Sequence, residues 1–330
     1  MINTRILYSD LLLFAFPLFL SISFAKKPNI LFILSDDQSH RSVGCYPESP
    51  DWVKTPHIDS LARDGIRFAH CYMSSWCMAA RATLLTGHQS YGVRSMRMEG
   101  EYPGSVYNSE DCPFWPSVFR KDGYQTAQIG KWHTGIDNGF GRDWDFQKVW
   151  NRPAFPGNSG NYFKEQLIQT NGKKAVMTQG YSTDNYTKWA EEYIRGGHGK
   201  EESKPFYLWL CYGAVHGPFT PAKRHINHYP NAKVDIPKDI YPPRNGKPEY
   251  SRNKEQWIPG PHGIPMLKSG KFSGRTVSGK FIHGMDIHSL ERQYHQGVLA
   301  IDEGVGKLIK ALKETGQYEN TLIVYGADQG

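Results

Sequence analysis

Cysteine is scarce in this chain of 330 residues, and its spacing excludes a common kind of metal site. The five cysteines include no C-x-x-C pair, which argues against a structural zinc site. Because their number is odd, at least one has no partner within the chain if the protein enters an oxidising compartment. We take Cys77 as the unpaired one. The others, which could form disulfides or remain small buried thiols, are Cys45, Cys71, Cys112 and Cys211.

Long apolar runs are absent beyond the first 25 residues. A membrane-spanning helix needs about 20 apolar residues, so we expect no span in the rest of the chain. The first residues are typical of an export signal, because Arg5 precedes an apolar run at 11–22 and small residues at 23–25 offer a cleavage site. We expect a signal peptide at 1–25 and an exported protein, periplasmic or secreted, that begins at Lys26. A membrane anchor is the alternative, which the shortness of the run disfavours.

The sequence also lacks a nucleic-acid-binding module, internal repeats and low-complexity tracts. Hydrophobic residues make up 39% of the chain, enough for a large core in one domain or in two closely packed ones. The formal charge of +7 is compatible with a polyanionic substrate, and at least as compatible with a merely soluble basic surface. Composition therefore indicates a globular protein but does not favour any particular activity.

Buried strands and helices alternate along the chain. Strand-like apolar runs lie at 29–37, 67–72, 124–130, 205–213 and 321–330, and helix-like segments at 56–64, 78–85, 115–123, 186–196 and 290–316. Thr55 is expected to cap the first helix, with Pro56 at its first position and Gly65 after its end. This alternation predicts an α/β fold with a mostly parallel sheet covered on both faces. The alternation of strand-like and helix-like segments stops between Pro221 and His288, which predicts a long functional or mobile loop there.

Polar side chains follow the predicted strands at their carboxyl ends, where the ligands of open α/β sheets collect. These residues are Asp36, Asp37, Lys131, His133, His216, Asp328 and Gln329. The predicted strand at 67–72 is followed by Cys77 and Arg81. We therefore expect all of these groups to converge at one edge of the sheet.

The acidic residues among them favour a hard divalent cation. Adjacent carboxylates at Asp36 and Asp37 repel each other unless a cation lies between them. Asp328 and the amide oxygen of Gln329 complete an all-oxygen set suited to Ca²⁺ or Mg²⁺, whereas the shortage of histidine argues against zinc. An acidic turn after a strand would explain the first pair alone. It would not explain Asp328 at an equivalent strand end.

The stretch SSWCMAARATLLTGH, residues 74–88, places Cys77 at or just before a helix start. Unpaired backbone N–H groups at such a position predict a lowered pKa for the thiol. Arg81, four residues later, lies on the same helical face and could hold an anion or orient Cys77. The alternative is a buried free cysteine beside a surface arginine.

Lys131 and His133 are two residues apart in an extended segment, so their side chains are expected on one side of it. A cation together with an imidazole suits the stabilisation of a transferred anionic group and proton transfer. His216, in the stretch AVHGPF, is either a turn histidine or a general acid for a leaving group. Spacing alone does not choose between these roles.

Taken in order, six motifs resemble the sulfatase family of the alkaline phosphatase superfamily. They are NILFILSDD, CMAARATLLTG, GYQTAQIGKWH, VHGPF, AIDEGVGKLI and VYGADQG, extending from Asn29 to Gly330. The resemblance implies a formylglycine-dependent, arylsulfatase-like enzyme with the alkaline phosphatase-like three-layer α/β/α sandwich. It implies that residues 26–330 form the N-terminal part of a catalytic domain that hydrolyses sulfate esters of small molecules or polysaccharides.

The resemblance also implies roles for single residues. Cys77 is the precursor of formylglycine, made by a maturation enzyme, and the hydrated aldehyde attacks sulfur. Arg81 fixes the modified residue, and Lys131 neutralises charge. His133 removes a proton so that sulfate is expelled, and His216 contacts sulfate or protonates the leaving oxygen. One Ca²⁺ is held by Asp36, Asp37, Asp328, Gln329 and the modified Cys77.

The sequence departs from the family pattern in ways that bear on maturation and completeness. Ala79 stands where the usual signature has proline, which concerns recognition by the maturation enzyme, although a Cys-x-Ala-x-Arg form occurs among bacterial members. Gln329 replaces the commoner Asn or His, and its amide oxygen still suits a hard cation. A further catalytic lysine and a smaller C-terminal subdomain are expected after Gly330, so we expect a truncated chain.

Other classes of function stay open on the sequence. A phosphate-ester hydrolase or phosphotransferase of the same superfamily would use two metal ions and a Ser or Thr nucleophile. A non-catalytic homologue would bind sulfated glycans without turnover. A cysteine hydrolase using Cys77 and a histidine would leave the acidic set unexplained.

Overall fold

The structure is a computed structural model, and it describes most of the chain after the expected signal peptide. The described residues are 26–74, 76–89, 91–92, 109–110, 112–158, 160–268, 271–272, 275–276 and 285–330. The expected signal peptide, residues 1–25, lies outside them.

A central sheet has the strands β1 (Asn29–Ser35), β2 (Gln125–Lys131), β3 (Phe146–Trp150), β4 (Gln166–Thr170), β5 (Val176–Thr178), β6 (Phe206–Cys211) and β11 (Thr321–Ala327). Their order is β11-β1-β6-β2-β3-β4-β5. The strands from β11 to β3 run parallel, and β4 and β5 join antiparallel. Leu34 pairs with both Gly326 and Cys211, so neighbouring strands end at one level. The mostly parallel sheet predicted from the sequence is confirmed.

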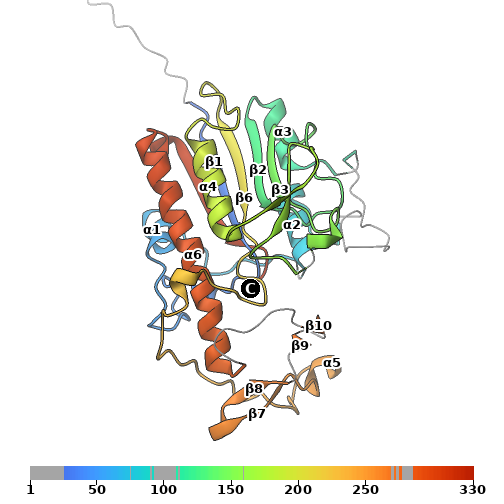
Figure 1. The fold of residues 1–330 in the computed structure, drawn as a ribbon, viewed down its shortest axis with the longest axis vertical. Coiled ribbons are helices and arrows are strands. Elements are labelled where there is room, and N and C mark those ends of the chain that lie inside the picture. Colours follow the sequence, from blue (N-terminus) through green and yellow to red (C-terminus); the bar gives the residue numbers. More distant parts are fainter. Residues whose placement is uncertain are drawn as a thin grey trace, which may run out of the picture.

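Helices cover both faces of this sheet, as Figure 1 shows. They are α1 (Pro56–Asp64), α2 (Cys77–Thr86), α3 (Trp115–Lys121), α4 (Ser182–Ile194) and α6 (Ile287–Glu314). α1, α4 and α6 pack against the face that carries Leu31 and Ile33, whereas α2 packs against the face that carries Leu34. Side chains of one strand alternate between faces, so β1 serves both layers. The three-layer α/β/α architecture is therefore confirmed.

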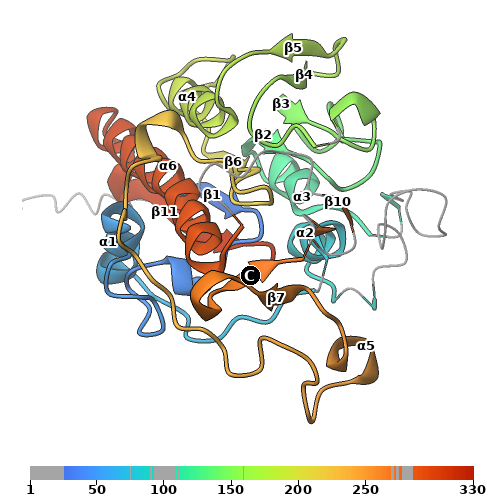
Figure 2. The ribbon, with the colours of Figure 1, turned by 60° about the horizontal axis from the view of Figure 1, so that its bottom comes forward.

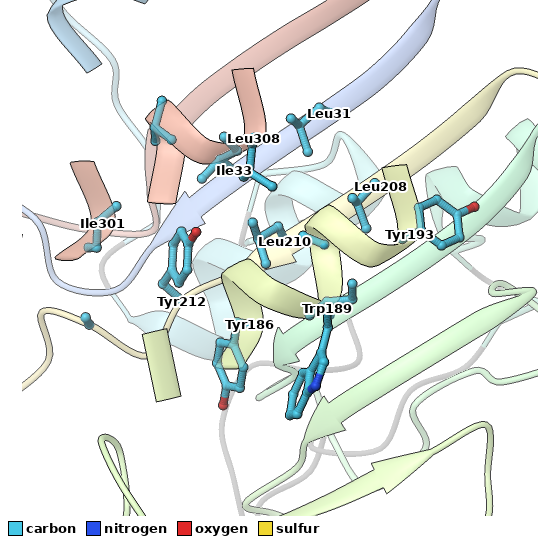
Figure 3. Packing of buried hydrophobic residues seen from close by; sticks show 14 of the residues in the cluster. Leu31, Ile33, Tyr186, Trp189, Tyr193, Leu208, Leu210, Tyr212, Ile301 and Leu308 are labelled. Carbon is cyan, nitrogen blue, oxygen red and sulfur yellow. The ribbon is translucent and has the colours of Figure 1, made fainter. Parts of the chain in front are cut away.

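The core beneath α4 and α6 is apolar and aromatic (Figure 3). Leu208 and Leu210 of β6 are fully buried there together with Tyr186 of α4 and Leu308 of α6. Burial of one such leucine contributes about 1.5–3 kcal/mol relative to leaving it in water. The core on the opposite face is built around the fully buried Trp132, Trp144 and Trp209. Two independent cores hold the sheet rigid, which fixes the level of its strand ends.

Helix α1 begins at Pro56 and is followed by Gly65, as the sequence predicts. Thr55 occupies the N-cap position, but its hydroxyl makes no capping bond to the helix backbone. The carboxylate of Asp302 on α6 accepts hydrogen bonds from the backbone N–H groups of His57 and Ile58 instead, at 3.0 and 2.9 Å. A side chain from a distant helix therefore caps α1.

The strand predicted at residues 67–72 is wrong. This segment has no regular secondary structure, and Phe68 and Tyr72 are 70% and 86% exposed. The described sheet ends at β11 and β5, and neither strand pairs with this segment. A strand is stabilised by cross-strand partners, so the strand-forming residue types of this segment were not sufficient to make it a strand. Cys77 is reached through a loop rather than from a strand end.

The described residues between Pro221 and His288 are largely loop, as predicted. Its short elements are the 3-10 helices η3 (Lys223–His225) and η4 (Pro261–Gly263), helix α5 (Glu249–Arg252) and strands β7 (Trp257–Pro259), β8 (Pro265–Leu267), β9 (Lys271–Phe272) and β10 (Arg275–Thr276). Other 3-10 turns are η1 (His40–Ser42), η2 (Pro156–Asn158) and η5 (Tyr318–Asn320). Figures 1 and 2 place β7 to β10 beyond the carboxyl ends of the central strands. Within the described residues, every helix is too short or too polar to cross a membrane.

Candidate active site

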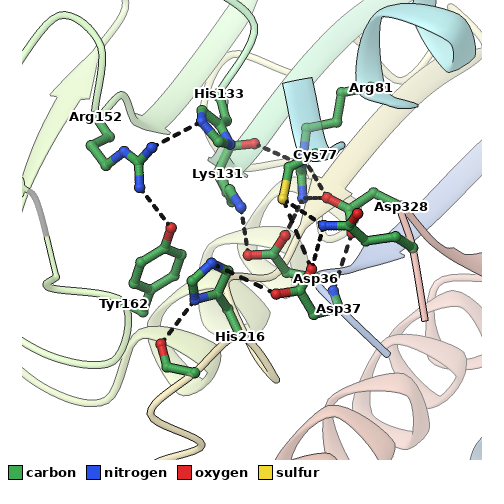
Figure 4. Close-up of polar contacts among 12 residues, drawn as sticks. Asp36, Asp37, Cys77, Arg81, Lys131, His133, Arg152, Tyr162, His216 and Asp328 are labelled. Carbon is green, nitrogen blue, oxygen red and sulfur yellow. Dashed lines mark hydrogen bonds and ion pairs between the residues drawn. The ribbon is translucent and has the colours of Figure 1, made fainter. Parts of the chain in front are cut away.

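Polar residues from separate parts of the chain meet at the carboxyl edge of the sheet (Figure 4). Asp36 directly follows β1, Lys131 ends β2, and Asp328 directly follows β11. Backbone hydrogen bonds join these strand ends, because the N–H of Asp328 donates to Ser35 at 3.1 Å and that of Asp36 donates to Ala214 at 2.9 Å. The convergence expected from the strand order therefore occurs.

Two carboxylates and two cations form a buried cluster beneath this edge. Asp36, Asp328 and Arg81 are 0% exposed, and Lys131 is 1% exposed. The ammonium of Lys131 lies 2.5 Å from Asp36 Oδ2. One guanidinium nitrogen of Arg81, Nη2, lies 2.9 Å from Asp328 Oδ2 and 3.4 Å from Asp36 Oδ1. Arg81 is therefore not the surface arginine of the structural alternative, because it links two acidic strand ends.

The charges of this cluster adjust one another's protonation. Burial alone would raise the pKa of Asp36, but Lys131 beside it holds that pKa below its usual value. Burial and the nearby Asp36 raise the pKa of Asp328. Burial opposes the charged forms of Lys131 and Arg81, yet the adjoining carboxylates raise the pKa of each. Both cations are therefore kept protonated in a region closed to water.

Asp37 brings a third carboxylate to the same place. One ligand atom from each of Asp36, Asp37, Cys77 and Asp328 can be chosen so that all lie within 4.8 Å of one another. The Gln329 amide nitrogen donates to Asp37 Oδ1 at 2.6 Å and to Cys77 Sγ at 2.9 Å. Rotation of that amide would turn its oxygen toward the cluster, since amide orientation follows the local partners. Converging hard oxygen donors with this surplus of negative charge fit a Ca²⁺ or Mg²⁺ ion.

The backbone of Asp37 is fixed in an unusual conformation. Its φ is 55°, in the left-handed region that few non-glycine residues adopt. The hydroxyl of Tyr294 on α6 donates to the Asp37 carbonyl at 3.0 Å and accepts from the Ser39 N–H at 2.7 Å. The Asp37 N–H donates to Asp328 Oδ1 at 3.1 Å. These bonds hold the turn that directs the Asp37 carboxylate toward Cys77.

Cys77 is the first residue of α2, as the sequence predicts, but the predicted lowering of its pKa is wrong. The side chain is buried, and this burial raises the pKa of the thiol, with the Asp36 and Asp328 carboxylates acting in the same direction. The nearby ammonium of Lys131 only partly opposes them. A neutral thiol is a poor nucleophile, so the surroundings of Cys77 disfavour a cysteine hydrolase.

The two histidines of the sequence prediction lie on the outer side of the cluster (Figure 4). His216 Nε2 lies 3.6 Å from Asp37 Oδ2, and its Nδ1 lies 2.8 Å from the Gly217 carbonyl oxygen. His133 is 3% exposed and has a φ of 51°, which turns the chain after β2. Its Nε2 lies 3.3 Å from a guanidinium nitrogen of Arg152. His216 therefore faces the carboxylate of Asp37 directly, whereas His133 contacts Arg152, which follows β3.

Sequence reasoning missed Arg152, Tyr162 and Tyr294 at this site. Arg152 comes two residues after the end of β3, a strand that the sequence analysis did not predict, so the strand-end rule that selected the other residues did not reach it. Tyr294 lies within the helix-like segment at 290–316, and that pattern gives no sign that its hydroxyl holds Asp37. Tyr162 lies in a loop before β4 and carried no sequence signal.

Comparison with known proteins places this arrangement in a family. The sequence profile described as Sulfatase matches residues 28–330. An N-acetylglucosamine-6-O-sulfatase of Bacteroides thetaiotaomicron is 26% identical over 92% of this chain and 58% of its own length. An uncharacterized sulfatase of Escherichia coli is 29% identical over 92% of this chain and 57% of its own. An ulvan-active sulfatase of Formosa agariphila is 26% identical over 92% of this chain and 50% of its own.

Solved structures share the fold. A protein in complex with its substrate D-glucosamine-2-N,6-O-disulfate superposes with a TM-score of 0.69 at 23% identity, over 92% of this chain and 66% of its own. A protein in complex with k-i-k-neocarrahexaose superposes with a TM-score of 0.64 at 25% identity, over 92% of this chain and 58% of its own. The chain thus spans half to two thirds of the length of these relatives. Because the profile match extends over nearly the whole chain, the chain belongs to the sulfatase family.

Proposed function

We propose that this protein hydrolyses sulfate esters with an oxygen nucleophile formed from Cys77. The observation that carries the proposal is the convergence of Cys77 with Asp36, Asp37 and Asp328, whose ligand atoms lie within 4.8 Å of one another. The raised pKa of Cys77 supports it, because a thiol that stays protonated needs conversion before it can attack an ester. As the hydrate of formylglycine, residue 77 would supply the attacking oxygen.

A bound Ca²⁺ would belong to the same site. The residues that would hold it are Asp36, Asp37, Asp328, Gln329 and the modified Cys77. Such an ion would neutralise developing negative charge on the transferred group and favour the ionised form of the nucleophile. The carboxylates supply the hard oxygen ligands that Ca²⁺ prefers.

The protein's own cations and histidines would complete the chemistry. The buried Lys131 and Arg81 form ion pairs with Asp36 and Asp328, and their fixed positive charge would stabilise the negative charge of a sulfate group bound beside them. Arg81 also orients Asp328, to which its Nε donates at 3.0 Å. His216, through Nε2 on the open side of Asp37, would protonate the leaving oxygen or contact sulfate. His133 would accept the proton that leaves residue 77 when sulfate is released.

The substrate class we propose is a sulfated carbohydrate. Relatives are named for N-acetylglucosamine-6-O-sulfate and ulvan, and a structural neighbour was solved with a carrahexaose. The net charge of +7 is in keeping with a polyanionic substrate. We further propose that residues 26–330 belong to one catalytic domain, that residues 1–25 export it, and that a maturation enzyme acts on Cys77 despite Ala79.

Mass spectrometry of residue 77 tests the proposal directly. Tryptic peptides of natively expressed full-length protein are expected to carry an aldehyde at this position, and a desulfation screen of sulfated oligosaccharides is expected to show turnover. Cys77→Ala should abolish that turnover, whereas Cys45→Ala is the matched control that retains it. An unmodified thiol in the native protein, or full activity of Cys77→Ala, would falsify the mechanism.

Metal content separates the proposal from a phosphate-ester hydrolase. We expect one Ca²⁺ per chain in purified protein. Two Zn²⁺ ions, with phosphate-ester cleavage that survives Cys77→Ala, would favour the alternative enzyme. Tight binding of sulfated glycans without any release of sulfate from native protein would instead favour a non-catalytic homologue.

A further inference from the structure

Tyr162 packs directly against one of the two histidines of the site (Figure 4). Its ring stacks on the His216 imidazole with the ring centres 3.8 Å apart and the planes 7° from parallel. The Trp150 ring lies edge-on to Tyr162 at 4.7 Å, with an interplanar angle of 63°. Tyr162 is only 3% exposed. His216 is therefore backed by a rigid aromatic surface that limits its rotation.

Arg152 connects the same tyrosine to the other histidine. One guanidinium nitrogen, Nη1, donates to the Tyr162 hydroxyl at 3.0 Å, and Nη2 lies 3.3 Å from His133 Nε2. A guanidinium can only donate hydrogen bonds, so Nε2 of His133 must accept this one. His133 is thereby restricted to the neutral tautomer that has its proton on Nδ1, and Nε2 is the nitrogen that can take up a proton.

The tautomer of His216 is set in a similar way. The Gly217 carbonyl oxygen can only accept, so His216 Nδ1 at 2.8 Å must donate to it. The stacked Tyr162 ring fixes the plane of the imidazole, which leaves Nε2 directed toward Asp37 at 3.6 Å. Orientation and tautomer are therefore specified for both histidines.

The backbone around Tyr162 and Arg152 is anchored to the rest of the fold. The Tyr162 carbonyl accepts from the Ser182 hydroxyl at 2.7 Å and from the Gln166 amide at 3.1 Å. Next to Arg152, the Asn151 amide donates to the Ile136 carbonyl at 3.0 Å. Because these anchors come from separate elements, neither residue can shift without disturbing well-packed structure.

We propose that Arg152 and Tyr162 form a positioning pair for proton transfer, in which Arg152 holds His133 in the tautomer that can accept a proton at Nε2 and Tyr162 holds the orientation of the His216 imidazole. This inference rests on the proposed function, in which both histidines move protons. Neither residue is expected to touch the reacting atoms. Proton transfer by a side chain depends on hydrogen-bond geometry, so a freely rotating imidazole would meet its partner less often. The pair therefore acts on the rate of the chemical step rather than on substrate binding.

Nitrogen NMR of the imidazoles tests the pair without any turnover. The full-length protein is labelled with ¹⁵N in its histidines, and His133→Gln and His216→Gln spectra identify the two signals. We expect His133 to show an unprotonated Nε2 and a protonated Nδ1 in the unaltered protein. Arg152→Met should convert this signal to a mixture of tautomers. A protonated Nε2 in the unaltered protein, or the same spectrum in Arg152→Met, overturns the proposal even if sulfate hydrolysis itself is established.

Kinetics of matured protein test the consequence for catalysis. Arg152→Met and Tyr162→Phe should each lower kcat by about 10- to 100-fold and leave KM within about twofold, as for other residues that orient a catalytic side chain. The double variant should be no slower than Arg152→Met, because both changes remove one shared hydrogen bond. Tyr162→Leu, which also removes the stacked ring, should be slower than Tyr162→Phe.

A matched control is available for the tyrosine change. Tyr181 is partly buried, and its hydroxyl donates to the Thr220 carbonyl at 2.9 Å, outside the positioning pair. Tyr181→Phe should leave kcat and the histidine signals unchanged. Additive losses in the Arg152→Met/Tyr162→Phe double variant would show that the two residues act independently and would overturn the proposal. A rise in KM with unchanged kcat would overturn it as well, because it would show that Arg152 binds substrate.

Discussion

Among the arginines that bridge two carboxylates in the described residues, Arg81 and Arg224 lie in very different surroundings. Arg81 bridges Asp36 and Asp328 at the carboxyl edge of the sheet, and all three side chains are 0% exposed. Arg224, in η3, bridges Asp184 of α4 and Glu303 of α6, and these side chains are 37–40% exposed. We refer to them as the inner and the outer cluster. Both make short contacts, with nearest nitrogen–oxygen distances of 2.9 Å in the inner cluster and 2.6 Å in the outer one.

The difference in exposure changes what each cluster does. Water competes for the outer cluster and screens it, so its contribution to folding is small. The inner cluster lost the hydration of every charge when it was buried, so its ion pairs mainly offset that cost. A folded protein that tolerates such a cost generally uses the charges, and here they lie beside Cys77 and Asp37. The outer cluster is therefore a surface contact between helices, whereas the inner cluster is part of a preorganised site.

The largest effect is expected from removing the inner arginine. Arg81→Met should lower the free energy of unfolding by about 3–5 kcal/mol, because it leaves Asp36 and Asp328 buried with Lys131 as their one remaining cation in the described cluster. Denaturant unfolding followed by circular dichroism measures the loss. A cost as small as that of Arg224→Met would contradict the distinction between the clusters.

A smaller effect is expected from calcium. If the inner cluster binds Ca²⁺, an ion concentration about 100 times its Kd should stabilise the folded chain by about 2.7 kcal/mol. Thermal unfolding with and without a chelator measures this shift. Asp37→Asn should greatly weaken the response, whereas Asp184→Asn in the outer cluster should retain it. An undiminished response in Asp37→Asn would place the ion elsewhere.

An effect of intermediate size is expected from His295, a buried histidine whose neighbour Glu291 lies beyond hydrogen-bond distance. His295 is 5% exposed, and the nearest Glu291 carboxylate oxygen is 4.0 Å from its Nε2. Burial lowers the pKa of His295 to about 4, so the folded state resists its protonation. Stability is therefore complete above the unfolded pKa of about 6.5 and is lost as the pH falls toward 4, by about 2 kcal/mol between pH 7 and pH 5.

The His295 effect is measured as a difference between variants. His295→Gln should lose about 2 kcal/mol less than the unaltered chain when denaturant unfolding is compared at pH 7 and pH 5. The exposed His88 provides the control, because His88→Gln should follow the unaltered chain. Identical pH dependence in all three proteins would show that His295 is not the group responsible.

The smallest effect is expected from the outer cluster. Arg224→Met should lower the free energy of unfolding by about 0–1 kcal/mol, and the difference should shrink in 1 M salt, because exposed pairs are screened. Unfolding curves at low and high salt measure both quantities. A loss of several kcal/mol that is insensitive to salt would remove the contrast between the clusters.

Most of the fold could be predicted from local patterns. The apolar runs that became β1, β2, β6 and β11 have the length of strands, and those of β1, β2 and β6 are mostly buried, whereas the edge strand β11 is only partly buried. The periodic segments that became α4 and α6 present one apolar face. Alternation of the two types specified a parallel sheet. The polar residues at its strand ends, from Asp36 to Asp328, were then predicted to meet because ligands collect at the carboxyl edge.

Other features were decided only by long-range contacts. Residues 67–72 have the composition of a strand but form none, because no described strand lies beside them to accept their backbone hydrogen bonds. The pKa of Cys77 depends on carboxylates that arrive from β1 and β11 as well as on the start of its own helix. Arg81 became an internal ion-pair partner for the same reason.

The sequence by itself determined which residues could carry the chemistry and at which edge of the sheet they would lie. The tertiary structure decided which of them are buried and in what orientation, as the contacts of Arg152 and Tyr162 with the two histidines illustrate. The physical reason is that burial, tautomer and pKa depend on neighbours supplied by distant segments, whereas strand and helix patterns are set by residues close in the chain.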